Sequence, residues 1–206
     1  QTEVFSSLRS ALSESSPAQV ASHLAELGRF STFYARFLAP ETEPRTTARK
    51  ALTRLSRLDV TVAFPLLLNL YDRMERNVMT ETQFHTLLTV FENFLLRRSV
   101  CRVPTNTLNK MFPSLCAHLN ESTDLISDSK QFLSSRNYPA DADFYDKFCS
   151  VQMYGVADRV ARAKFILDSL EESFGHKEML NPGSLTIEHV MPQTLTEWWQ
   201  DALGDD

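Results

Sequence analysis

One stretch near the C-terminus brings together residue types that can cleave a phosphodiester bond. Glu188 and His189 are adjacent and fall within residues 185–190, where β-branched residues and alternation predict a short strand. Pro192 follows shortly after the histidine and stiffens the turn that leaves the strand. This order of an acid, a histidine and a nearby proline suits metal-assisted hydrolysis of a phosphodiester.

The two side chains would divide the chemistry between them. The carboxylate of Glu188 can bind a divalent cation through oxygen, and the neutral imidazole of His189 can accept a proton from water near pH 7. The cation would polarise the phosphate and stabilise the leaving oxygen. A histidine after a glutamate is also common as an ordinary surface or packed strand residue, so the pair needs support from the rest of the sequence.

That support comes from a resemblance to a known family. Residues 188–193 (EHVMPQ) resemble the first strand of an HNH nuclease, also called a His-Me finger or ββα-metal nuclease. The wider sequence resembles the C-terminal nuclease part of the GmrSD family of modification-dependent restriction endonucleases, over about residues 60–203. Ahead of EHVMPQ, the segments that match this family in order and spacing are 92–101 (ENFLLRRSVC) with 105–112 (TNTLNKMF), and 162–171 (RAKFILDSLE).

The resemblance implies roles for individual residues. His189 matches the general base that activates water, and Glu188 matches the carboxylate beside it that contacts the metal, Mg²⁺ or Mn²⁺. Pro192 and Gln193 match the turn after the strand and have a structural role. In the family a second strand and a helix then bring an Asn or His to the metal, whereas this sequence stops at Asp206. Because a metal site needs more ligands than one acid and one histidine, we expect the metal to bind only in the complete finger and the 206-residue chain to be inactive by itself.

The function implied is that of an HNH-type DNA endonuclease or nickase, acting on modified or phage double-stranded DNA in phage defence. In the family an N-terminal ParB-like domain hydrolyses nucleotide and senses modified DNA, so such a domain is an expected partner. The present sequence has no G-x-G-x-x-G and no G-x-x-x-x-G-K-S/T, and we expect no nucleotide hydrolysis from it. The alternative is a non-catalytic helical interaction or regulatory module of a phage-defence protein, in which the histidine is incidental.

The elements that must position this chemistry are mainly helices. Only five of the 206 residues are glycine, below the usual share of about 7%, and so few argue against a sandwich or barrel with many tight turns. Gly175, Gly183 and Gly204 fall in the last 32 residues and mark a second structural unit. We therefore predict an all-α multi-helix body over 1–178, followed over 179–206 by the first strand of an incomplete ββα-metal (HNH) finger.

Capping signals and apolar spacing place the individual helices. Ser16-Pro17 starts a helix that runs to about Leu38, and Thr80 with Gln83 forms a capping box for the clearest helix of the sequence. Residues 134–143 are predicted to be a loop. Further helices are expected over about 45–58, 64–74, 108–119, 144–151 and 156–174, with a short one around Trp198.

The same spacing predicts which side chains face the core. The expected buried sets are Val20, Leu24, Leu27 and Phe30; Ala48, Leu52, Leu55 and Leu58; Phe84, Leu87, Leu88, Phe91, Phe94 and Leu95; and Val160, Phe165, Leu167 and Leu170.

Charged and aromatic clusters have two interpretations each. Five bases within 45–57 (Arg45, Arg49, Lys50, Arg54 and Arg57) can face phosphates, although a solvated helix face is the commoner explanation. Arg97 and Arg98 end a helix, where cations complement its dipole. They can also support a DNA path or a neighbouring domain, but the structural role is favoured. Trp198-Trp199 can stack on bases, but packing of the tail against the main body is favoured.

Charge and cysteine content limit the surroundings of the protein. Residues 178–206 hold six acids and no Lys or Arg, whereas residues 1–177 hold 20 acids and 21 bases, so the tail accounts for the net charge of −5. Three cysteines far apart predict buried, reduced thiols in a cytoplasmic protein. No apolar run is long enough to cross a membrane, and no secretory signal is present.

Overall fold

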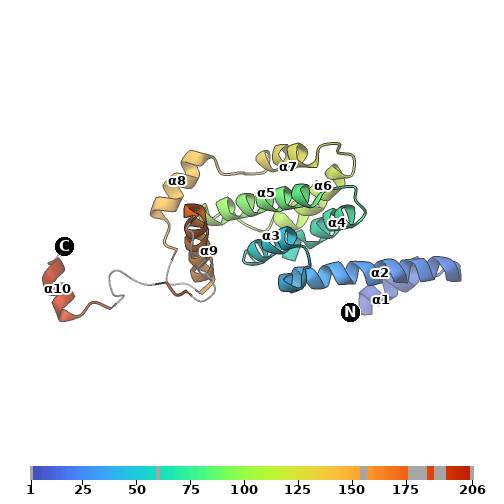
Figure 1. Cartoon of the computed structure of the whole chain (residues 1–206), viewed down its shortest axis with the longest axis horizontal. Coiled ribbons are helices and arrows are strands. Elements are labelled where there is room, and N and C mark those ends of the chain that lie inside the picture. The colour runs from blue at the N-terminus through green and yellow to red at the C-terminus, as the bar shows by residue number, and fades with distance from the viewer. Residues whose placement is uncertain (1, 59–60, 154–156, 176–184, 188–193, 205–206) are drawn as a thin grey trace. The chain divides into compact units, whose positions relative to one another are not determined.

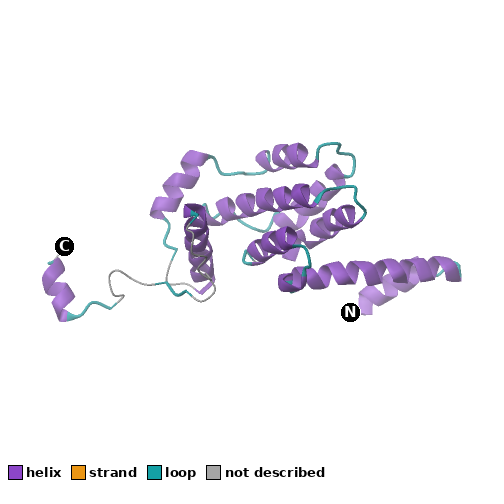
Figure 2. Ribbon diagram, in the orientation of Figure 1, coloured by secondary structure: helices purple, strands orange, loops and turns teal. Residues whose placement is uncertain are grey.

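The computed structural model describes residues 2–58, 61–153, 157–175, 185–187 and 194–204. The regular secondary structure of these residues is entirely helical, as Figure 2 shows, so the predicted all-α class is confirmed. The α-helices are α1 (Thr2–Ala11), α2 (Pro17–Leu38), α3 (Thr46–Ser56), α4 (Phe64–Glu75), α5 (Glu81–Val100), α6 (Leu108–Leu119), α7 (Leu125–Ser134), α8 (Asp141–Ser150), α9 (Ala157–Phe174) and α10 (Glu197–Leu203). Short 3-10 helices occupy Pro40–Thr42 and Thr61–Ala63.

The chain divides into two compact units, Gln1–Val151 with α1 to α8 and Gln152–Asp206 with α9 and α10. The predicted division into a helical body over 1–178 and a nuclease finger over 179–206 stays a prediction, because the residues around its boundary lie outside the described part. The strand predicted over 185–190 is not confirmed. Residues 185–187 have no regular secondary structure, and 188–190 lie outside the described residues.

The first unit is built around α5. This helix packs against α3, α4, α7 and α8, and Figure 1 shows it between α3 and α7. The six apolar side chains predicted for its inner face are all buried, with exposed fractions of 7% or less. The face predicted for α3 is also buried, so the apolar spacing located the core correctly where helices surround one another.

Two long helices begin at the predicted caps. The Ser16 side chain accepts from the backbone N–H of Gln19, whose own side chain accepts from Ser16 N at 2.8 Å. At the start of α5, Gln83 N donates to Thr80 Oγ1 at 3.1 Å and Thr80 N donates to Gln83 Oε1 at 2.9 Å. Each capping box satisfies two backbone donors that the first turn leaves without partners.

The buried face predicted for α2 is wrong in its first half. Leu24 and Leu27 are 57% and 48% exposed, and every side chain from 21 to 29 is exposed. The helix instead buries Phe33 and Phe37 near its C-terminal end, where both rings contact Tyr71 of α4. The apolar pattern was present along the whole helix, but the helices of the core pack only against its second half.

A similar correction applies to α9. Phe165 is buried as predicted, whereas Leu167 and Leu170 are each 48% exposed. Asp168, three residues after Phe165, is buried in their place. The helix ends at Gly175, whose positive φ of 62° confirms it as the predicted C-terminal stop.

None of the helices in the described residues is long and apolar enough to cross a membrane.

The central position of α5 predicts a large difference between two leucine truncations. Leu87→Ala, in α5, should lower the free energy of unfolding by about 2–5 kcal/mol because it leaves a cavity in the core. Leu24→Ala, on the exposed half of α2, should lower it by less than about 1 kcal/mol. Urea unfolding followed by circular dichroism measures both, and equal losses would contradict this description of the core.

Candidate functional site

The predicted catalytic pair, Glu188 and His189, lies outside the described residues, as do Pro192 and Gln193. Their roles therefore stay predictions. Just before them, Thr186 is exposed and Ile187 is half-buried. Among the described residues, no three His, Cys, Asp or Glu side chains are grouped closely enough to hold a metal ion.

The two tryptophans contact each other in α10. Their ring centroids lie 5.1 Å apart with an interplanar angle of 83°, an edge-to-face arrangement. Trp198 is 67% exposed. The helix ends where Gly204 N donates to Gln200 O at 3.0 Å, with Gly204 at a φ of 75°. Packing of this pair against the main body stays a prediction.

Two bases of the stripe over residues 45–57, Arg45 and Arg54, bind carboxylates inside the first unit. Arg54 Nε and Nη2 donate to the two carboxylate oxygens of Glu92, at 2.9 and 2.7 Å, which ties α3 to α5 by a bidentate pair. Arg45 Nη1 donates to Glu75 Oε1 of α4 at 2.7 Å. These two arginines therefore serve helix packing, and neither the solvated-face interpretation nor the phosphate interpretation describes them.

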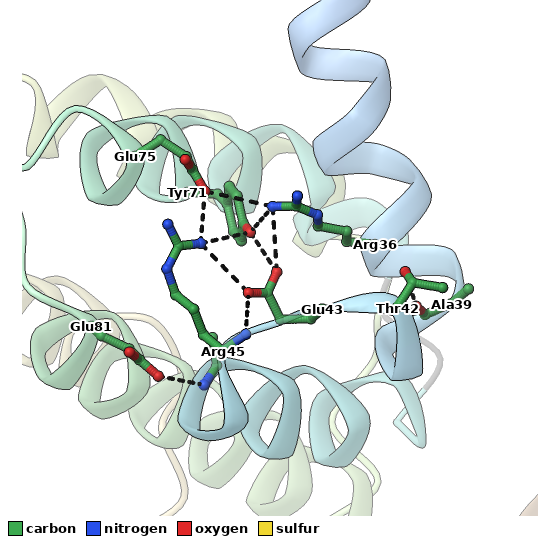
Figure 3. A network of polar contacts seen from close by, with 9 residues as sticks. Arg36, Ala39, Thr42, Glu43, Arg45, Tyr71, Glu75 and Glu81 are labelled. Atoms are coloured by element: carbon green, nitrogen blue, oxygen red, sulfur yellow. Dashed lines mark hydrogen bonds and ion pairs between the residues drawn. The ribbon is translucent and has the colours of Figure 1, made fainter.

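Arg45 belongs to a larger polar network, which Figure 3 shows. Its centre is the carboxylate of Glu43, which is fully buried just after the 3-10 helix Pro40–Thr42. The Tyr71 hydroxyl donates to Glu43 Oε2 and accepts from Arg36 Nη1 of α2. Arg45 N donates to Glu43 Oε1 at 3.0 Å, and Arg36 Nη1 lies 3.5 Å from Glu75 Oε1. Two acids and two bases thus neutralise one another around a tyrosine.

The network also fixes the protonation of its members. Burial, followed by the hydrogen bond to Glu43, raises the pKa of Tyr71 above its usual value, so its hydroxyl stays protonated and keeps donating. The hydrogen bond from Arg45 lowers the pKa of Glu75, opposed by partial burial, and keeps that carboxylate charged. Because Tyr71 stays protonated and Glu75 stays charged while the groups face one another, the network is suited to joining α2, α3 and α4.

A carboxylate from a neighbouring helix caps the start of α3. The N-cap residue of this helix, Arg45, makes no capping bond with its own side chain. The Glu81 carboxylate, from the first turn of α5, accepts from Ala48 N at 3.2 Å. A donor that the helix start leaves open is thereby satisfied across two helices, and negative charge at a helix N-terminus is itself stabilising.

A second polar cluster lies at the C-terminal end of α5. Arg98 is only 4% exposed and donates to backbone carbonyls of two loops: Pro104 O at 2.7 Å, Arg136 O at 3.1 Å and Asn137 O at 3.4 Å. Its guanidinium also lies over the ring of Phe94, 5.3 Å from the centroid. Burial lowers the pKa of Arg98. The structural role predicted for this residue is confirmed, but it consists of holding loops as well as complementing the helix dipole.

Arg97 holds the next part of the same loop. It donates to Pro139 O at 3.2 Å and pairs with Asp141, at the start of α8, at 2.6 Å. Its guanidinium lies over the rings of Tyr138 and Phe144, 5.2 and 4.9 Å from their centroids. Together the two arginines fasten residues 136–144 to the end of α5.

The described residues thus define an all-helical protein whose polar clusters join helices to one another. Residues 138–206 match the family model described as GmrSD restriction endonucleases, C-terminal domain. Over these residues the match supports the predicted similarity to the GmrSD family of restriction endonucleases. No curated protein and no solved structure matches the chain.

The matched segment begins where α5 holds the chain. Tyr138 is its first residue, and the Tyr138 hydroxyl donates to Asn93 Oδ1 of α5 at 2.6 Å. Asn93, Arg97 and Arg98 all belong to the segment 92–101, which lies before the matched residues. Their contacts indicate that this segment anchors the start of the C-terminal domain, a role that its spacing alone did not reveal.

The Arg98 contacts predict a large cost for its removal. Arg98→Ala should lower the free energy of unfolding by about 3 kcal/mol, because it removes a buried side chain whose guanidinium donates to the carbonyls of two loops. Arg9→Ala, at an exposed position of α1, serves as the control and should change it by less than about 0.5 kcal/mol. Urea midpoints measure both variants, and a wild-type midpoint for Arg98→Ala would contradict the anchoring role.

The lowered pKa of Glu75 predicts a loss of stability in acid. The folded chain holds this carboxylate deprotonated at a lower pH than the unfolded chain does, so its contribution is present above the ordinary value of 4.5 and disappears as the pH falls below it. Between pH 6 and pH 3, urea midpoints of Glu75→Gln should therefore fall less steeply than those of the wild type. Glu14→Gln, which removes an exposed carboxylate, should follow the wild-type curve, and parallel curves for all three proteins would refute the prediction.

Proposed function

We propose that the chain is the C-terminal part of an HNH-type DNA endonuclease of the GmrSD kind, with His189 as the general base and Glu188 as a metal ligand. One observation supports this above all others: the family match over residues 138–206 includes both residues. The substrate would be double-stranded DNA that is modified or of phage origin, and a separate nucleotide-hydrolysing domain would sense it.

The chemistry of the pair fits this function in part. The imidazole of His189 would take the proton from the attacking water, which requires the neutral form that histidine has near pH 7. A divalent cation, when bound, would supply positive charge to the phosphate oxygens. Glu188 and His189 offer one carboxylate and one imidazole, and a metal site needs further ligands in fixed geometry. We therefore propose that these two residues do not suffice to hold the metal.

A helical interaction or regulatory module is the second candidate function. It is favoured by the internal pairing of the basic stripe, since Arg45 and Arg54 bind carboxylates of neighbouring helices and are not free to contact phosphates. In this case the described helices would dock a separate nuclease or sensor domain, and His189 would have no catalytic role.

Nicking of supercoiled plasmid DNA in Mg²⁺ or Mn²⁺ separates the two functions. The 206-residue chain should not nick, because Glu188 and His189 alone do not suffice to hold the metal, whereas a protein in which the chain is joined to a complete finger should. In that protein His189→Ala should lower the rate by about 10²–10⁴-fold, the usual contribution of a general base. His23→Ala, which removes an exposed histidine of α2, should leave the rate unchanged.

Two results would count against the nuclease proposal. If His189→Ala nicked at the wild-type rate, His189 would not be the general base. Robust nicking by the 206-residue chain itself, abolished by His189→Ala, would show instead that the pair and its surroundings already suffice.

A further inference from the structure

A groove of about 430 Å³ runs between α5 and α7 in the first unit. Its walls are largely apolar, formed by Val90 and Phe94 of α5, Leu133 of α7 and the ring of Tyr138. Asn93 and Lys130 contribute polar groups. The volume and this mixture of apolar walls with a few polar groups are typical of sites for small organic ligands.

The aromatic wall of the groove is held in place before any ligand binds. Tyr138 and Phe94 lie nearly parallel, with an interplanar angle of 19° and centroids 6.2 Å apart. The Tyr138 hydroxyl is fixed by Asn93 Oδ1 at 2.6 Å, and the Arg97 guanidinium lies 5.2 Å from the ring centroid. Tyr138 nevertheless keeps 36% of its surface exposed. A flat ring can therefore pack here at little cost in side-chain ordering.

The polar groups of the groove are mainly donors. Since Asn93 Oδ1 already accepts from Tyr138, its amide nitrogen offers two N–H donors, which have no partner among the described residues. Lys130 is exposed and makes no ion pair with any described residue. It is also the one charged residue among those that line the groove. The groove thus combines an apolar cleft, an amide donor and a single positive charge.

We propose that this groove binds one nucleotide, with the base against the apolar and aromatic walls and the phosphate at Lys130. A base supplies a flat ring with acceptor atoms for Asn93, and its phosphate supplies the anion. The base must be out of a duplex stack to enter, so the ligand is a single-stranded or extruded nucleotide, or a free mononucleotide. The link to a DNA strand rests on the function proposed above.

The test measures binding without cleavage. A fluorescein-labelled single-stranded 12-mer DNA is titrated with the 206-residue chain in EDTA, and anisotropy gives the dissociation constant at several salt concentrations. Lys130→Ala should weaken binding severalfold and reduce the slope of log affinity against log salt by about 0.7, the effect of one lost phosphate contact on a single strand. Thr89→Trp, which fills the groove from its α5 side, should weaken binding about tenfold.

Matched controls use the same changes away from the groove. Lys110→Ala removes an exposed lysine of α6, and Thr82→Trp adds the same bulk at the exposed start of α5. Both should bind as the wild type does. Lys130→Glu gives a second groove variant that needs no repacking, in case Thr89→Trp has a lowered urea midpoint, and it should bind more weakly than Lys130→Ala.

Competition identifies the source of the nucleotide. Displacement of the 12-mer by deoxynucleoside monophosphates would assign the site to free nucleotides as well, whereas displacement only by unlabelled oligonucleotide would assign it to a DNA strand. Displacement by inorganic phosphate at the same concentration as a mononucleotide would overturn the proposal, because the base would contribute nothing. So would wild-type affinity of the groove variants, or no binding of any of these ligands.

The outcome is separable from that of the proposed function. If the groove variants lose binding in EDTA but the complete protein shows no His189-dependent nicking, the nucleotide groove is supported and the nuclease proposal is refuted. If His189-dependent nicking occurs but the groove variants bind as the wild type does, the nuclease proposal is supported and the nucleotide groove is refuted.

Discussion

The buried carboxylate of Glu43 is the constraint on which the first unit depends. A charge with no exposed surface is tolerated only when it is paired and hydrogen-bonded. Arg36, Arg45 and Tyr71 satisfy it from three different segments, and Glu75 balances the second positive charge. Any separation of α2, α3 and α4 would leave at least one of these charges buried without a partner. The apolar core makes these helices associate, and the network selects the arrangement in which they do so.

The C-terminal end of α5 holds the start of the segment that matches the GmrSD family model. The family match begins at Tyr138, and residues up to Val151 belong to the first compact unit. The first helix of the matched segment, α8, packs against α5. The boundary of the family domain and the boundary of the compact units therefore fall at different places. We interpret the helical body as the support on which the start of the domain is held, mainly by backbone carbonyls that accept from Arg97 and Arg98.

How much the sequence could predict depends on the range of the interaction. Local signals predicted the starts of α2 and α5 correctly, because each capping box lies within four residues. The start of α7 was missed, although Asp124 caps it by accepting from Ser127 N at 3.1 Å, a signal of the same local kind. The burial of Leu24 and Leu167 was predicted wrongly, since apolar spacing shows that a helix has an apolar face and not whether another helix covers it.

For charged residues, too, the sequence predicts only those pairs whose members lie close together in the chain. No acid lies within the positive stripe of 45–57, and yet Glu92 binds Arg54 across a separation of 38 residues. A local motif cannot reveal such a pair, whereas Glu188 and His189 were found because they are adjacent. Arg45, Arg54, Arg97 and Arg98 are all engaged within the first unit, so the phosphate contact proposed above is assigned to a different side chain, Lys130. Of the five bases in the stripe, Arg45 and Arg54 are thereby held by carboxylates of neighbouring helices.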